Sequence, residues 1–278
     1  MNLIALLLGA IATFSPFFGL ILALMYCSFS LRGAQVKPMQ ALGLVLVFPV
    51  MFAVFFREQS GSLLVASDAL FGVGLAALTF LASLRRGFLP AAALANSALL
   101  VIAYGIARQF LFGASLSLAN EQALAEMAKA FPQFAKTPQL QTTMALIKQM
   151  NPSAWVVSQL LALFAGFVIL LRLSGAKFVW KAIHFPPYYN LAILAVLPLY
   201  LLPQLRLVFV NALVALCILP IIQGVGVVSH FIARHTSNVI LMVLATLLII
   251  FNLFLVALLG FADIWLNFRK LNLKGTTV

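Results

Sequence analysis

Acidic side chains are nearly absent from this sequence. Its 278 residues include five Asp and Glu against 17 Lys and Arg, and 64% of the residues are hydrophobic. The first 31 residues contain no charged side chain at all. About a quarter of the residues in a soluble domain are charged, whereas a helix that crosses a bilayer needs about 20 consecutive apolar residues. The sequence therefore predicts an integral membrane protein whose main partner is the lipid bilayer.

The apolar runs also lack the alternation of apolar and polar residues that a membrane β-barrel requires. They are continuous, as in residues 241–250. Because every backbone amide inside hydrocarbon needs a hydrogen-bond partner within the protein, continuous apolar runs predict α-helices. We therefore predict an all-α polytopic transmembrane bundle, with residues 1–278 forming a single integral membrane domain.

Several chemical signatures are missing as well. The chain has no Gly-rich phosphate loop, no His-Glu-x-x-His and no Gly-x-Ser-x-Gly motif, so we predict no catalytic residues. Its three histidines lack the spacing of metal ligands, and we expect no metal and no cofactor. Cys27 and Cys217 lie in separate apolar runs, which is typical of small buried side chains. Cytoplasmic loops of membrane proteins accumulate Lys and Arg, so the net charge of +12 does not require a nucleic-acid partner.

Charged residues and prolines divide the chain into apolar segments. Two of them, 2–14 and 17–31, are short for a span and are separated by Ser15-Pro16, where proline favours a break. Another, 188–203, is short and contains two prolines. From these segments we predict about eight spans. The segments are 2–14, 17–31, 38–56, 62–84, 88–112, 153–172, 188–203, 206–232 and 238–266.

One long stretch, 114–152, is polar enough to leave the membrane. Apolar residues recur at helical spacing in two parts of it, 124–131 and 140–147. We predict two short amphipathic helices that lie against the membrane surface or cap the bundle.

The distribution of Lys and Arg predicts the orientation. If 188–203 enters the membrane and returns on the same side, 11 of the 17 Lys and Arg residues share one side with both termini. The positive-inside rule places that side in the cytoplasm. We therefore expect a multi-pass protein of the cytoplasmic (inner) membrane, with both termini cytoplasmic and 114–152 outside.

Two charged residues lie within predicted spans, where charges are costly and need partners. Asp68 and Arg108 have similar depths in the outer halves of the 62–84 and 88–112 spans, and we predict that they pair. The alternative is that each side chain reaches the headgroups separately. Near the end of the last span, Asp263 also needs a basic neighbour, such as Arg206 or Arg269.

Three further polar side chains could complete a site around the first pair. Tyr104 precedes Arg108 by four residues and so shares its helix face. Gln223 and His230 share a face of a later span. Together with Asp68, these residues could line a ligand-binding pocket open to the outer side. Alternatively they form interhelical hydrogen bonds worth about 1 kcal/mol or less each, which we favour for Gln223.

Small residues predict two close helix contacts. Ala5, Gly9 and Thr13 recur every four residues along the first helix, which suits packing within this chain or docking of a partner subunit. Gly224 and Gly226 follow a proline in a later span, where a bend would let backbones approach closely.

The C-terminal region resembles a known family. The residues that carry the resemblance are Gln223-Gly224, Leu259-Gly260-Phe261-Ala262-Asp263 and Asn267-Phe268-Arg269-Lys270. In these residues the chain resembles the YybS-like family of bacterial predicted membrane proteins. Its motif positions here are Gln223, Gly224, Gly260, Asp263, Phe268 and Arg269.

The resemblance has implications for function and location. It implies a bacterial inner-membrane protein. The YybS-like family is distantly similar to the S components of energy-coupling-factor vitamin transporters, in which a small-residue stripe on the first helix docks a partner. By that similarity Ala5, Gly9 and Thr13 would be the docking stripe.

Three functions stay open. The leading hypothesis is a non-enzymatic, transport-associated subunit that binds a small or amphipathic solute from the outer side and acts with other membrane protein subunits. The alternatives are a scaffold that organises envelope proteins and an intramembrane enzyme that uses Asp68 or Asp263. Solute binding predicts that Asp68, Arg108 and His230 surround a cavity, whereas a scaffold predicts paired polar groups in a dry core.

Overall fold

The computed structural model describes residues 2–32, 42–43, 45–59, 61–130, 138–175, 177–235, 243–244, 247 and 249–271. Every regular element in these ranges is a helix, so the all-α prediction is confirmed for them. The elements are α1 (Asn2–Phe14), α2 (Pro16–Arg32), α4 (Val47–Phe55), α5 (Ser62–Ser67), the π-helix η1 (Asp68–Leu75), α6 (Ala76–Arg85), α7 (Pro90–Ala130), α9 (Pro138–Leu173), η2 (Trp180–Ala182), α10 (Tyr188–Val196), η3 (Leu197–Leu201), η4 (Pro203–Leu205), α11 (Arg206–Leu216), α12 (Ile218–His235) and α14 (Leu253–Leu266).

Four described stretches are long and apolar enough to cross a membrane, as expected of a membrane protein. They are Ser62–Arg85, Pro90–Ala123, Gln149–Leu173 and Pro203–Arg234. The other apolar helices have 10–17 residues, fewer than the roughly 20 that a straight span needs. The structure therefore supports four spans by length and composition, and does not confirm the predicted eight.

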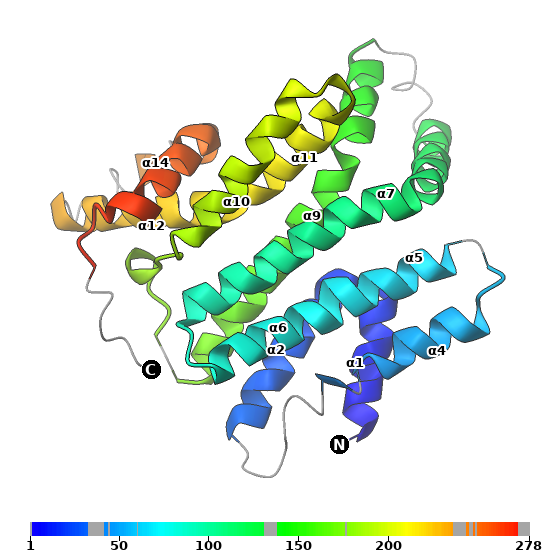
Figure 1. Cartoon of the computed structure of the whole chain (residues 1–278), viewed down its shortest axis with the longest axis horizontal. Helices are drawn as coiled ribbons and strands as arrows, with labels where there is room; N and C mark the ends of the chain where they lie inside the picture. Colours follow the sequence, from blue (N-terminus) through cyan, green and yellow to red (C-terminus); the bar gives the residue numbers. More distant parts are fainter. Residues whose placement is uncertain are drawn as a thin grey trace.

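The long helices α7 and α9 form the centre of the molecule (Figure 1). On one side of α7 lie α1, α2 and α4 (blue) and the continuous α5–η1–α6 rod (cyan); on the other lie α10 and α11 (yellow). Helix α2 packs against α9, and α6 packs against α7. The fully buried side chains of this core include Leu20, Leu24, Phe80, Leu94 and Leu163. At one end of the molecule, α12 and α14 form a separate pair.

The predicted break at Ser15-Pro16 is present. Helix α1 ends at Phe14, and Pro16 opens α2 at the first helical position, where its missing N–H costs nothing. The chain turns so sharply that a side chain at Gly19 would overlap Ala12.

The small-residue stripe of α1 faces this chain's own residues 45–48. A Cβ atom at Gly9 would lie 2.7 Å from the Val45 oxygen and 2.9 Å from Phe48 Cβ. Ala5 and Thr13 are buried on the same face. Of the two interpretations, the structure supports packing within the chain, since a partner could dock at this stripe only by displacing residues 45–48.

The 114–152 excursion differs from its prediction. Both of its helical parts are extensions of long helices, since α7 continues to Ala130 and α9 begins at Pro138. Of the two predicted spans that flank the excursion, the 88–112 span ends at a kink in the helix, at Phe112 (φ −122°, ψ 16°). The prediction of two separate short helices therefore holds only in part: the kink at Phe112 sets the first helix off from its span, whereas the second is an extension of the α9 span. The side chains that would form the two amphipathic faces lie outside the described residues.

Helix α9 also passes through Pro152, although we predicted a start at 153. The next amide, Ser153 N, donates to Asn211 Oδ1 at 2.9 Å, and Asn211 Nδ2 donates to the Gln149 oxygen at 3.0 Å. A regular helix would join Ser153 N to the Gln149 oxygen directly. The Asn211 carboxamide from α11 is thus inserted into α9, which keeps both backbone groups bonded next to the proline.

The 188–203 segment does not return on the side where it starts. Tyr188 Oη donates to Asn96 Oδ1 at 2.6 Å, near the start of α7. Leu207, just after this segment, lines the larger cavity together with Arg108 and Gly113, near the other end of the span. Hydropathy counts residues and therefore underestimates the length of the 188–203 segment, because 3₁₀ turns such as η3 rise about 2.0 Å per residue against 1.5 Å in an α-helix. If 188–203 spans fully, Arg172, Lys177 and Lys181 change sides in the count of cations, and the orientation stays a prediction.

Helices α12 and α14 approach each other at backbone distance. A Cβ atom at Gly224 would overlap the backbone of Val256, and one at Gly260 would overlap the Pro220 oxygen. Because backbone atoms cannot rotate away as side chains can, only glycine fits at these two positions.

We predict that Gly260→Ala lowers the free energy of unfolding by about 1–3 kcal/mol through overpacking. The matched control is Gly113→Ala in α7, where nothing lies within 4 Å of the added Cβ atom. Alanine is the better helix former, so the control should gain about 0.5–1 kcal/mol. Thermal unfolding of the purified protein measures both, and equal melting temperatures would contradict the close approach.

Candidate functional site

Asp68 and Arg108 form the predicted ion pair. Arg108 Nε donates to Asp68 Oδ1 at 2.7 Å, and Arg108 Nη2 donates to Oδ2 at 2.8 Å. The two side chains are about 9–10% exposed. This is a bidentate contact between a planar guanidinium and a carboxylate, the strongest geometry for such a pair. The alternative, in which each side chain reaches the headgroups separately, is excluded.

Aromatic side chains enclose this pair. Tyr104 Oη donates to Asp68 Oδ1 at 2.7 Å, as its position one turn before Arg108 allows. The Arg108 guanidinium lies over the Trp155 ring, 4.6 Å from its centroid. Phe71 stacks on Tyr104 with ring centroids 5.0 Å apart. The rings shield the ion pair and add a cation–π contact to it.

A local change of helix type accompanies this arrangement. The π-helix η1 begins at Asp68, and such wide turns often occur at functional sites. Within it, Gly72 leaves room for Trp155, whose ring would lie 2.9 Å from an added Cβ atom. One turn after Trp155, Gln159 is buried and its Oε1 has no hydrogen-bond partner among the described residues.

Two adjoining cavities lie between α7, α9 and α11. The larger, about 290 Å³, is lined by polar side chains together with four apolar or glycine residues. Its polar residues are Arg108, Gln109, Ser117, Asn120, Gln149 and Asn151. The smaller, about 130 Å³, has a mainly apolar wall. Its apolar residues include Ile102, Ile106, Val156, Val208, Ala212 and Ala215.

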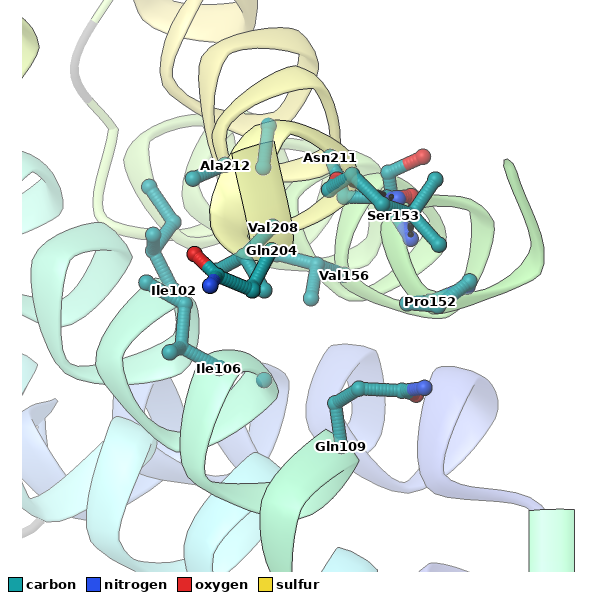
Figure 2. Close-up of a pocket in the computed structure, with 13 residues that line it drawn as sticks. Ile102, Ile106, Gln109, Pro152, Ser153, Val156, Gln204, Val208, Asn211 and Ala212 are labelled. Carbon is teal, nitrogen blue, oxygen red and sulfur yellow. Dashed lines mark hydrogen bonds between the residues drawn. The ribbon is translucent and has the colours of Figure 1, made fainter. Parts of the chain in front are cut away.

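The two cavities share three wall residues, Gln109, Pro152 and Leu207. Figure 2 shows Ile102 and Ile106 of α7 facing the α11 residues across the smaller cavity. Gln109 lies further along α7. The compartment beside the Asp68–Arg108 pair, with six polar residues in its wall, thus continues into one whose wall has fewer polar residues.

The structure does not bring the other two predicted pocket residues to this place. Gln223 Nε2 donates to Asp263 Oδ2 at 2.6 Å, and its Oε1 accepts from Phe185 N at 2.9 Å. His230 is half-buried and contacts the Phe231 ring, with centroids 5.6 Å apart. Both residues belong to α12, which packs against α14 rather than α7. The predicted pocket of five residues is therefore wrong in these two members, and the interhelical hydrogen bond favoured for Gln223 is confirmed by its bond to Asp263 of α14.

Gln223 belongs instead to a second buried polar cluster, in which Asp263 and Arg269 form an ion pair. Arg269 Nη2 and Nε donate to Asp263 Oδ2 at 2.7 and 3.1 Å. Arg269 also donates to two backbone oxygens of the loop before α10, to Lys181 through Nη1 at 3.0 Å and to Ile183 through Nη2 at 2.6 Å. Both charged side chains are fully buried. Of the two predicted partners of Asp263, Arg269 is the one observed.

The C-terminal motif positions therefore meet in space. Three of them hydrogen-bond to one another, namely Gln223, Asp263 and Arg269. Gly224 and Gly260 allow the close approach of α12 and α14 described above. Phe268 is the exception, since 41% of its surface is exposed.

Sequence reasoning missed several residues of these two regions. Asn190 is fully buried, and its Nδ2 donates to the Phe261 oxygen at 2.9 Å. Burial lowers the pKa of His184, which favours the neutral ring. Among the described residues, no partner contacts Asp263 Oδ1, Asn190 Oδ1 or His184 Nε2, although all three atoms are buried. At the first site, Trp155 was missed because its spacing in the sequence does not indicate which helix it faces.

Comparison of the chain with protein-family models, with curated proteins and with solved structures found no match. The YybS-like resemblance stays a prediction that rests on the C-terminal motif residues.

We predict that Asp68→Asn lowers the free energy of unfolding by about 3–5 kcal/mol, because the buried Arg108 charge loses its partner. Removing both charges in Asp68→Asn/Arg108→Gln should be less damaging than Asp68→Asn alone. Thermal unfolding provides the measurement. Glu58→Gln is the matched control in an exposed turn and should change stability by less than about 0.5 kcal/mol. A double variant that is less stable than Asp68→Asn alone would contradict the pairing.

We predict that Arg269→Lys loses about 3 kcal/mol of stability, since an ammonium group cannot reproduce the hydrogen bonds to Asp263 and two loop oxygens together. The neighbouring Lys270 is exposed, so Lys270→Arg should leave stability unchanged. Unfolding of the two variants side by side tests whether the geometry of the guanidinium, rather than the charge, is required.

Proposed function

We propose that this protein is a membrane-embedded binding subunit for a small amphipathic solute. The observation that carries the proposal is the pair of adjoining cavities between α7, α9 and α11, whose walls are mainly apolar and present a few polar side chains, with more polar residues around the larger cavity. Ligand sites combine an apolar lining with a few convergent polar groups. A solute with a polar head and an apolar tail would match the two walls.

The Asp68–Arg108 pair supports this use of the site. Arg108 lines the larger cavity, while its bonds to Asp68 and its contact with Trp155 fix the guanidinium in one position. Binding to a preorganised wall avoids the entropy cost of ordering side chains. The pair therefore holds the shape of the polar compartment.

A non-enzymatic role fits the composition of the cavity walls. Among the described residues that line the two cavities, Arg108 is the only ionisable side chain, and Asp68 compensates its charge. General acid–base chemistry needs a side chain able to exchange a proton near neutral pH. An arginine held by a carboxylate does not supply one.

The scaffold hypothesis receives less support. It expects paired polar groups in a dry core and an exposed small-residue or apolar patch for partners, and the bonded Asp68 and Arg108 fit the first of these expectations. Here Ala5, Gly9 and Thr13 are buried, with Gly9 against Val45 and Phe48, and the core contains the two cavities.

In this proposal the protein acts in transport with partner subunits of the bacterial inner membrane. Ser117 and Asn120 come from the part of α7 beyond the Phe112 kink, and Gln149 and Asn151 come from the start of the α9 span. The excursion therefore forms part of the wall of the polar cavity. A partner that contacts the excursion could control access to the solute.

Photolabelling tests the proposal. The protein in lipid nanodiscs is irradiated with three amphiphiles that share one diazirine-bearing hexyl chain and carry an uncharged, an anionic or a cationic head. We predict that at least one probe labels the cavity residues of α7 and α9. Val208→Phe should reduce this labelling about tenfold by filling the apolar cavity, whereas Val210→Phe, on the exposed face of α11, should not. Labelling of exposed helix faces alone, with all three probes, would refute solute binding.

A further inference from the structure

We infer that the solute carries an uncharged head with hydroxyl or amide groups, joined to a short apolar chain. This inference rests on the proposed binding function and specifies its ligand class. It follows from the charge balance of the walls, from their hydrogen-bonding groups and from the size of the apolar compartment.

The first step concerns charge. Arg108 is the only charged side chain among the described residues that line the two cavities, and it is bonded through two nitrogens to the buried Asp68. An anionic head would compete with Asp68 for Arg108 and leave a buried carboxylate without its partner, which is strongly unfavourable. A cationic head would find no carboxylate in the walls. The site is therefore neutral overall and favours a neutral head.

The second step concerns hydrogen bonds. The polar wall consists mainly of side-chain amides, from Gln109, Asn120, Gln149 and Asn151, with the hydroxyl of Ser117. Such groups both donate and accept hydrogen bonds. Hydroxyl and amide groups of a ligand do the same, so each can pair with this wall. Asn151 Nδ2 donates to Asn120 Oδ1, which joins the two helices at the wall.

The third step concerns the chain attached to the head. The smaller cavity measures about 130 Å³ and is lined by aliphatic side chains such as Ile102, Val156 and Val208. An engineered apolar cavity of about 150 Å³ in another protein binds benzene. The compartment therefore has room for a chain of about six carbons, and a long acyl chain would not fit within it.

Gln109 occupies the junction of the two compartments, because it lines both cavities. A head bound in the polar compartment, with its chain in the apolar one, has to pass this side chain. Gln109 is therefore the residue whose charge should determine which head is accepted.

The test uses the three hexyl probes in nanodiscs and compares their labelling of the cavity. In the unaltered protein, the probe with a glycerol head should label the cavity about tenfold more than the carboxylate and ammonium probes. Gln109→Lys should shift the preference about tenfold toward the carboxylate probe. The control Gln59→Lys adds the same charge at an exposed turn outside the cavity walls and should keep the original preference.

Each outcome separates the two proposals. Cavity labelling in which a charged probe equals or exceeds the glycerol probe overturns the inference and leaves solute binding standing. Labelling by none of the probes refutes the binding function itself. If Gln109→Lys keeps the original preference while melting as the unaltered protein does, the head is not placed at Gln109 and the inference fails. If that variant does not fold, the preference of the unaltered protein among the three heads still decides.

Discussion

The constraint on which this structure depends is that polar groups among apolar helices must find their partners inside the protein. The sequence contains two Asp residues, Asp68 and Asp263, and the structure buries both. Each is bonded to an Arg, to Arg108 and Arg269 respectively. Breaking either pair would leave a buried charge uncompensated. The first pair joins η1 to α7, and the second, through Gln223 and two backbone oxygens, joins the end of α14 to α12 and to the chain before α10.

The same constraint accounts for the irregular backbone around the cavities. The π-helix begins at Asp68 and contains Gly72, where the Trp155 ring approaches. At Pro152, where α9 loses an N–H donor, the Asn211 carboxamide satisfies the adjacent backbone groups. An interruption that would cost stability in isolation is thus stabilised by a side chain from a neighbouring helix.

How much the sequence could predict differs from residue to residue. The Asp68–Arg108 pair was predictable, since distance from the span ends fixes depth and a buried charge needs an opposite one. Gln223 and His230 were misplaced because helical periodicity gives the face of a residue but not the neighbouring helix. The path of 188–203 could not be read from hydropathy, which counts residues and is blind to the longer rise of 3₁₀ turns.

The position of the cavities follows from where the helices lose their regularity. Helix α7 is kinked at Phe112, and α9 contains Pro152. Residues next to these interruptions, Gln109 on α7 and Pro152 itself on α9, line both cavities. Two regular helices can pack ridges into grooves along their whole length, whereas a kink in one helix beside a proline in the other leaves space at the interruption, although Asn120 and Asn151 still join the two helices beyond it. The space left between them is walled by the start of α11 and by the polar excursion, which is why polar residues such as Ser117, Asn120 and Gln149 gather around the larger cavity.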